Sequence, residues 1–158
     1  MSVKPIPDGY HAITPYLIVK GAAQAIEFYQ KAFGAVELMR FDMPGGLIGH
    51  AEIKFGDSIV MLADEHPQMG AVGPHTVGGT PVGLCFYVTD VDAVAEKAIA
   101  AGAAVERPVR DQFYGDRSGT FRDPFGHKWT VATHKEDVSH EEMQRRLAAM
   151  TPQEKACA

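Results

Sequence analysis

Apolar and polar positions in the first half of the chain follow an order that predicts a strand, a helix and three more strands. A short apolar run at residues 13–19 predicts the first strand. Within residues 22–33, Ile26, Tyr29 and Phe33 recur at steps of three and four, which places them on one face of a helix. Glycine-rich breaks then separate three predicted strands at residues 35–41, 47–55 and 58–63.

The same order returns in the second half. Residues 82–88 predict a strand, and Asp90 or Asp92 is placed to cap the helix that follows. This helix carries small apolar residues on one face and ends at Gly102, as the first helix ends at Gly34. Three further strands are predicted at residues 105–109, 118–122 and 128–133.

A short stretch of sequence repeats together with this order. Residues 34–37 read Gly-Ala-Val-Glu, and residues 102–106 read Gly-Ala-Ala-Val-Glu. One helix on one small sheet buries too little apolar surface to be stable alone. We therefore expect a duplicated module. The alternative is that both stretches reflect only the preference of helix ends for glycine followed by small residues.

The length of 158 residues suits one compact domain, residues 1–158, because chains of about 100 to 200 residues commonly form a single core. Residues 65–81 are rich in Gly, Pro and His without a period, which predicts a linker. Ser139 and Glu142 have the spacing of a capping box and predict a C-terminal helix. We expect the first module at residues 10–64, the linker at 65–81, the second module at 82–134, and the helix and tail at 135–158.

Charge and cysteine content narrow the classes of function. The chain has 15 Lys and Arg against 20 Asp and Glu, a net charge of −5 and no basic run, so we expect no nucleic-acid partner. It contains no apolar stretch near the ~20 residues of a membrane span, and no signal-peptide pattern. Cys85 and Cys157 form no disulfide framework. We therefore expect a cytoplasmic protein without a membrane partner.

Several local motifs, together with the twofold order of elements, are similar to a known family. The motifs are GGTPV at residues 78–82, YVTDVD at 87–92, DQFYGDR at 111–117, RDPFGH at 122–127 and THKEDVS at 133–139. Over about residues 10–150 the chain resembles the vicinal oxygen chelate superfamily, and within it the PhnB-like branch. This superfamily includes glyoxalase I, extradiol dioxygenases, and bleomycin and fosfomycin resistance proteins. The resemblance implies an α+β fold, in which two βαβββ modules form a half-open barrel with helices on the convex face, a ligand cleft on the concave face and a C-terminal helix.

Metal-dependent members of this superfamily bind a divalent ion through side chains of the first and last strands of each module. Aligned by strand pattern, the corresponding positions here are Thr14, Met61, Gly83 and Thr130. None supplies an imidazole or a carboxylate, so we expect no metal and no other cofactor. His50 and Glu52 point to one side of a strand and leave open a displaced metal site, or simply a polar sheet face wetted by solvent.

Strand alternation separates the side chains expected in the cleft from those in the core, where Trp129 is expected. The expected ligand-binding residues are Thr14, Tyr16, His50, Met61, Tyr87, Asp116, Lys128 and Thr130. The candidate catalytic residues are Glu52 and Tyr114, as proton shuttles, and Arg117, as a clamp for an anionic substrate. Asp116 and Arg117 are alternatively a structural ion pair.

Two functions follow from these residues. The first is a small-molecule-binding protein of the glyoxalase and bleomycin resistance type, which holds a polar organic ligand in the concave cleft without the usual metal ligands. The second is a lyase, isomerase or hydrolase of the vicinal oxygen chelate type that uses acid–base residues or a displaced metal site. The resemblance also implies a homodimer, formed through an exposed edge strand or the tail helix.

Overall fold

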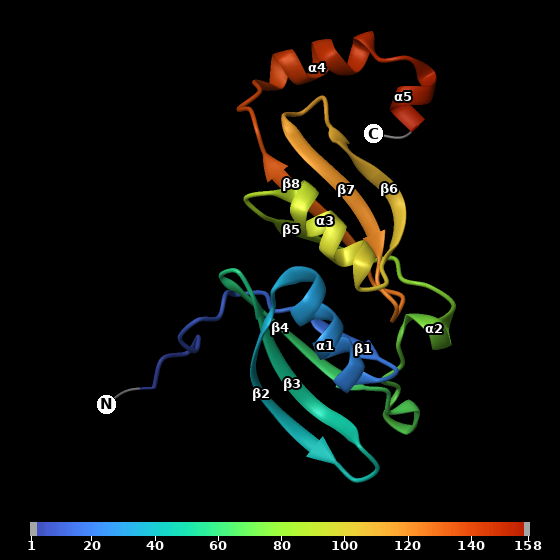
Figure 1. Cartoon of the computed structure of the whole chain (residues 1–158). Coiled ribbons are helices and arrows are strands. Elements are labelled where there is room, and N and C mark those ends of the chain that lie inside the picture. Colours follow the sequence, from blue (N-terminus) through green and yellow to red (C-terminus); the bar gives the residue numbers. More distant parts are fainter. Residues whose placement is uncertain (1–2, 157–158) are drawn as a thin grey trace.

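Each half of the chain forms a four-stranded mixed sheet that carries one long helix on one face (Figure 1). The structure is a computed structural model that describes residues 3–156. In the first half, β1 (Tyr16–Val19), β2 (Val36–Met43), β3 (Leu47–Phe55) and β4 (Ser58–Asp64) lie in the order β1-β4-β3-β2, with α1 (Ala22–Phe33) on one face. β1 runs parallel to β4, and the other neighbours are antiparallel.

The second half repeats this topology. Its strands β5 (Gly83–Tyr87), β6 (Ala104–Asp111), β7 (Asp116–Arg122) and β8 (Lys128–His134) lie in the order β5-β8-β7-β6, and α3 (Val91–Ala100) covers one face. Asp90 caps α3 by accepting a hydrogen bond from the backbone of Ala93. No strand of one sheet pairs with a strand of the other within residues 3–156, so the two sheets do not close into a barrel.

The remaining elements lie outside the two sheets. η1 (Pro67–Met69) and α2 (Pro74–Val77) lie in the segment predicted as a linker. Beyond β8, α4 (His140–Ala149) begins at its predicted cap Ser139, which accepts from the backbone of Glu142, and α5 (Pro152–Ala156) follows it. The predicted α+β fold of two βαβββ units and a C-terminal helix is confirmed. None of the helices in the described part of the chain has the length and apolar character needed to cross a bilayer.

The element bounds agree with the sequence pattern except at a few ends. α1 and β3 occupy the predicted residues 22–33 and 47–55. The first strand was predicted from residue 13 but begins at Tyr16, because the pairing of β1 with β4 starts there and Ile13 projects into solvent. Thr14 therefore precedes the strand. Cys157 lies outside the described residues.

The two halves are joined by a cluster of aromatic rings beneath the paired helices. α1 and α3 lie side by side (Figure 1). Tyr29 and Phe33 of α1 contact Trp129 of β8, with ring centroids 5.4 and 5.0 Å apart. Phe55 of β3 contacts the same indole at 5.1 Å and Phe86 of β5 at 5.7 Å. Trp129 is thus a core residue, as alternation along its strand predicted.

One buried carboxylate lies at the end of this cluster. Asp123, in the turn between β7 and β8, is only 4% exposed and accepts from Tyr29 Oη at 2.8 Å and Trp129 Nε1 at 2.9 Å. Its second oxygen accepts from the backbone of Phe125 and His127, each at 2.9 Å. Burial, assisted by the Asp123 charge, holds the pKa of Tyr29 well above its usual value, so this phenol stays a donor. Asp123 therefore binds the two halves together.

We expect Asp123→Asn to lower the free energy of unfolding by about 3 kcal/mol, because the amide nitrogen cannot accept the hydrogen bonds that the carboxylate accepts. Urea unfolding followed by circular dichroism measures this difference. Asp8→Asn is the matched control, since Asp8 is exposed and pairs with Lys4, which is also exposed. Equal stability of both variants would contradict the role given to Asp123.

Candidate functional site

The face of the first sheet opposite α1, here called the open face, brings several predicted residues together. Leu17 and Val19 of β1 are buried toward α1, so Tyr16 projects from the open face. Register pairs Tyr16 with Met61 of β4, and Met61 with Glu52 of β3. Three predicted site residues thus form one row across three strands.

A chain of hydrogen bonds runs over this row. Tyr16 Oη lies 2.8 Å from His50 Nδ1, and His50 Nε2 lies 3.4 Å from Glu52 Oε1. Tyr10, from the segment before β1, donates to the Glu52 carboxylate, which raises the pKa of Tyr10 to about 12. Burial raises the pKa of Tyr16. Both phenols therefore stay protonated at neutral pH and hold the imidazole and the carboxylate in place.

Tyr10 was not among the predicted site residues. It lies outside every periodic segment, so neither alternation nor helical spacing marks it. The only signal in the sequence is a tyrosine a few residues before the first apolar run.

A pocket of about 740 Å³ lies beside His50, and we call it the first-sheet pocket. Its apolar wall comes mainly from the β2–β3 hairpin and η1, and its polar groups lie along β1, β3 and the end of β4. The apolar residues used below are Phe41, Met43, Leu47 and Met69, and the polar ones are Tyr16, His50, Asp64, Glu65 and His66.

Asp64 fixes the rim of this pocket. Its Oδ1 accepts from the backbone N–H groups of Gly21 and Ala22 at 2.8 and 2.9 Å, at the start of α1. Its Oδ2 accepts from the backbone of Ile48 at 2.7 Å. The carboxylate thereby holds the N-terminus of α1 and the start of β3 against the end of β4.

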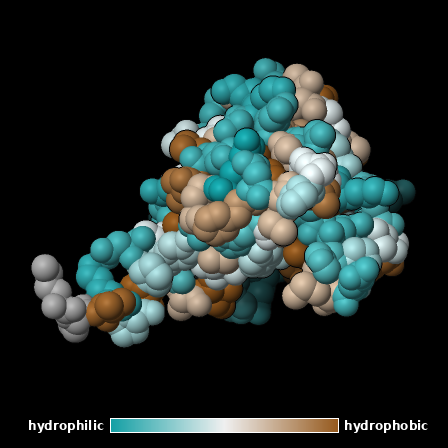
Figure 2. Space-filling view, turned by 90° about the horizontal axis from the view of Figure 1, so that it is seen from below, coloured by the Kyte–Doolittle hydropathy of each residue, from teal (hydrophilic) through white to brown (hydrophobic). Residues whose placement is uncertain are grey.

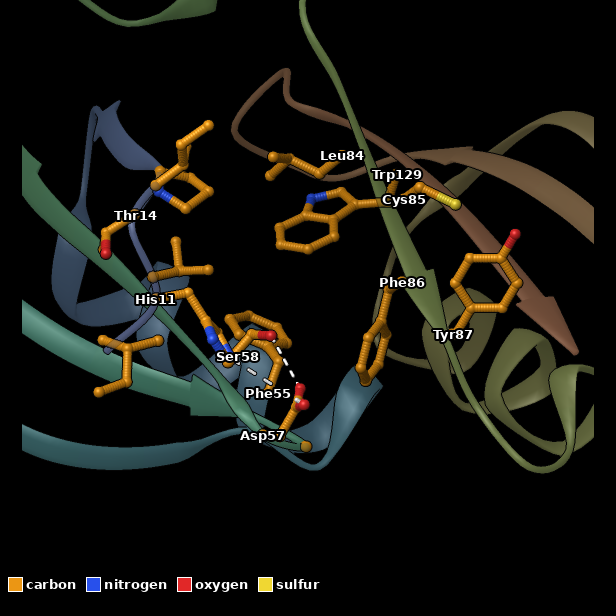
Figure 3. A pocket seen from close by; sticks show the side chains of 15 residues that line it. His11, Thr14, Phe55, Asp57, Ser58, Leu84, Cys85, Phe86, Tyr87 and Trp129 are labelled. Atoms are coloured by element: carbon orange, nitrogen blue, oxygen red, sulfur yellow. Dashed lines mark hydrogen bonds and ion pairs between the residues drawn. The ribbon is translucent and has the colours of Figure 1, made fainter. Parts of the chain in front are cut away.

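A second pocket, the junction pocket of about 580 Å³, lies between the two halves (Figure 3). Thr14 and His11 line one side, Cys85 and Tyr87 of β5 line the other, and Trp129 lies between them. Burial, followed by the charge of Asp116, raises the pKa of the Cys85 thiol, which keeps it from acting as a thiolate nucleophile.

The predicted polar residues at the end of the second sheet bind one another. The buried Asp116 carboxylate accepts from Tyr87 Oη at 2.8 Å and lies 2.7 Å from His134 Nδ1. The hydrogen bond to Asp116 raises the pKa of Tyr87 to about 12. The other ring nitrogen of His134 lies 3.0 Å from Asp137. These contacts fasten the end of β8 and the segment that leads to α4.

Arg117 lies on the opposite face of the second sheet from Asp116, because adjacent residues of a strand point to opposite sides. Its guanidinium makes two hydrogen bonds of 2.8 Å to Asp92 in the first turn of α3 and one of 3.2 Å to Asp111. It holds the pKa of Asp92 below its usual value. The alternative of an Asp116–Arg117 ion pair is wrong, since the two side chains have different partners.

The three predicted catalytic residues therefore occupy three environments. Glu52 lies on the open face of the first sheet, and Arg117 lies against α3. Tyr114 is in the turn before β7, with its ring edge-on to Phe113 and close enough to Tyr87 to raise that pKa. Two predicted ligand-binding residues lie on β8. Lys128 is 3.6 Å from Glu106, and Thr130 is 3.2 Å from the Thr120 hydroxyl.

Residues 10–131 match the family model described as the Glyoxalase/Bleomycin resistance protein/Dioxygenase superfamily. The chain belongs to this superfamily. The solved structure of TioX from Micromonospora sp. ML1 is 28% identical, with a TM-score of 0.64 over 78% of this chain and 98% of that chain. The PhnB protein from Bacillus cereus is 19% identical, with a TM-score of 0.62 over 78% of this chain and 99% of that chain, which shows the fold alone.

A sequence relative extends the comparison over most of the chain. Protein Rv0887c of Mycobacterium tuberculosis is 45% identical over 145 residues, which cover 90% of this chain and 84% of that protein.

The divalent ion of metal-dependent members of the superfamily does not fit the side chains found here. Met61 lies opposite Tyr16, and Thr130 lies opposite Cys85, so these rows offer a thioether, a phenol, a hydroxyl and a thiol that is held protonated. Within the described residues, no three His, Cys, Asp or Glu side chains are grouped so that they could hold one ion. His50 and Glu52 form a pair without a third such ligand.

We expect His134→Gln to change the pH dependence of stability. Hydrogen bonds, first to Asp116 and then to Asp137, raise the pKa of His134 above 6.5. The imidazolium therefore stabilises the fold fully below about pH 6.5, and this contribution is lost as the pH rises through the folded-state pKa. Urea unfolding from pH 6 to 9 should show a difference between wild type and variant that shrinks with rising pH. Asp137→Asn should show part of this effect, and a difference independent of pH would contradict the assignment.

Proposed function

We propose that this protein binds a small organic molecule in the first-sheet pocket. The observation that carries the proposal is a pocket of about 740 Å³ into which large apolar side chains project while still exposed: Phe41 is 58%, Met43 52% and Leu47 50% exposed. On the face seen from below, apolar residues lie scattered among polar ones (Figure 2). An apolar cavity of this size with a few polar groups at one side is typical of small-molecule sites.

We further infer a metal-free protein of the PhnB-like branch, acting in the cytoplasm without a nucleic-acid partner. The motifs at residues 78–82 and 122–127 support the branch. The lack of a fitting ligand set in the rows of Met61 and Thr130 supports binding without a metal.

A second candidate function is an acid–base lyase, isomerase or hydrolase. The hydrogen-bonded chain Tyr16–His50–Glu52 at the edge of the pocket favours it, because a carboxylate beside an imidazole is able to accept and return a proton. Turnover that is saturable and lost in Glu52→Gln, with binding retained, separates an enzyme from a binding protein.

We expect the neutral probe 2-naphthylmethanol to bind the wild-type protein in isothermal titration calorimetry. Phe41→Ala and Leu47→Ala should each weaken this binding about tenfold, because each removes apolar contact area of the pocket wall. Val105→Ala is the matched control, since Val105 is an exposed apolar residue of β6 outside the pocket. Unchanged affinity in both pocket variants would contradict the proposed site.

We also propose a homodimer that pairs through β2, the outer edge strand of the first sheet, which exposes Val36 and Leu38. Light scattering should then give twice the chain mass of 17.1 kDa. Replacing both residues by Lys should yield a monomer. Leu147→Lys on α4 is the control, and dissociation by this variant alone would assign the interface to the tail helix instead.

A further inference from the structure

The side chains that carry a fixed charge around the first-sheet pocket are all acidic. The ionisable side chains that line it are two carboxylates, Asp64 and Glu65, and two histidines, His50 and His66. Neither lysine nor arginine lines this pocket in the part of the chain that the structure describes. A ligand with a negative group would meet two carboxylates and no fixed positive charge, which disfavours an anion.

Two basic side chains lie near the first-sheet pocket without lining it. Arg40 of β2 is paired with Ala51, which is buried on the α1 side of the sheet, and its guanidinium lies 3.6 Å from Glu37 and 3.3 Å from Asp42. Lys20 is close enough to Glu65 to help lower its pKa, and it lines an adjoining hollow with Asp64 and Glu65 but does not line the first-sheet pocket.

The Glu65 and Asp64 carboxylates differ in how many backbone N–H groups they accept hydrogen bonds from. Asp64 is buried and accepts three backbone hydrogen bonds, two of them at the positive end of α1, so the fold already uses its charge. Glu65 is partly exposed, and its Oε1 accepts from the backbone of Gly73 at 2.7 Å. Hydrogen bonds from Thr76 and Gly73 lower the pKa of Glu65, so it is ionised at neutral pH. It is held in place and remains accessible from the pocket.

Aromatic rings lie along the same pocket. The His50 ring lies between Tyr16 and Phe41, with centroids 5.5 and 6.2 Å away. The faces of Tyr and Phe rings attract cations, and they stack on planar apolar groups. Like the carboxylates, the rings therefore favour a cationic ligand. They also suit a ligand with an aromatic or apolar body.

We propose that the ligand of the first-sheet pocket is an organic cation, with an apolar or aromatic body against Phe41, Met43 and Leu47 and a protonated amine directed toward Glu65. This inference rests on the proposed function, because it assigns a ligand class to the same pocket. The positive charge of the ligand, together with its shape, then determines how tightly it binds.

Three probes with one ring system and different charges test the proposal. They are 2-naphthylmethylamine, which is protonated at neutral pH, neutral 2-naphthylmethanol, and anionic 2-naphthoate. In calorimetry at low salt we expect the amine to bind about tenfold more tightly than the alcohol, and the acid more weakly than both. Added salt should reduce the preference for the amine, because the charges are partly exposed.

Glu65→Gln keeps an acceptor for Gly73 and removes the charge, so it should bring the amine and the alcohol to within about twofold of each other without weakening the alcohol. Glu27→Gln is the control, since Glu27 is an exposed carboxylate of α1 that pairs with Lys31. It should leave the preference unchanged.

The outcomes separate this inference from the proposed function. If the alcohol or the acid binds as tightly as the amine, the inference is overturned while the pocket stands. A preference for the amine that survives in Glu65→Gln also overturns it. If none of the three probes binds, the proposed function itself is contradicted.

Discussion

The carboxylate of Asp123 is the contact on which the arrangement of the two sheets depends. It lies in a turn of the second half and accepts a hydrogen bond from Tyr29 of the first half, beside rings contributed by both. The same carboxylate orients the Trp129 indole in the core. This contact and the aromatic cluster hold the halves together beneath α1 and α3, so the main core lies between the sheets and these helices. The open face of the first sheet carries both the first-sheet pocket and the row of hydrogen bonds beside it.

Buried carboxylates serve the same purpose at other points of the fold. Asp64 joins the start of α1 to β3, and Asp116 joins Tyr87 to His134. In each case an acidic side chain at a strand end or turn satisfies donors from distant segments, which a sheet of short strands cannot satisfy alone. Several polar side chains of the second half, among them Tyr87 and His134, therefore bind one another and not a ligand. The polar row of the first half is bordered by the first-sheet pocket, so the two similar halves use their polar side chains differently.

The spacing of apolar residues predicted most of the fold, because within a helix or strand it reflects which side chains are buried. Helical spacing marked α1, and alternation placed Tyr16, His50 and Glu52 on one face with Trp129 in the core. The contacts that unite the halves carry no such period: Asp123 and Tyr29 are 94 positions apart. Tyr10 binds Glu52 from a segment without regular structure. The alternative of an Asp116–Arg117 ion pair was wrong, because adjacent residues of a strand point to opposite faces of the sheet. Site residues joined by strand register were predictable, whereas those joined by loops were not.

The side chains of the first-sheet pocket also bear on the two candidate functions. A histidine held between a phenol and a carboxylate has the parts of a proton relay, but the phenols of Tyr10 and Tyr16 both keep their protons at neutral pH. Such a row orients polar groups more readily than it transfers protons. The wall of Phe41, Met43 and Leu47 offers apolar surface that costs free energy while it stays in water. Covering that surface with a ligand recovers this free energy without any chemical step, which is why binding is the function that this geometry supports first.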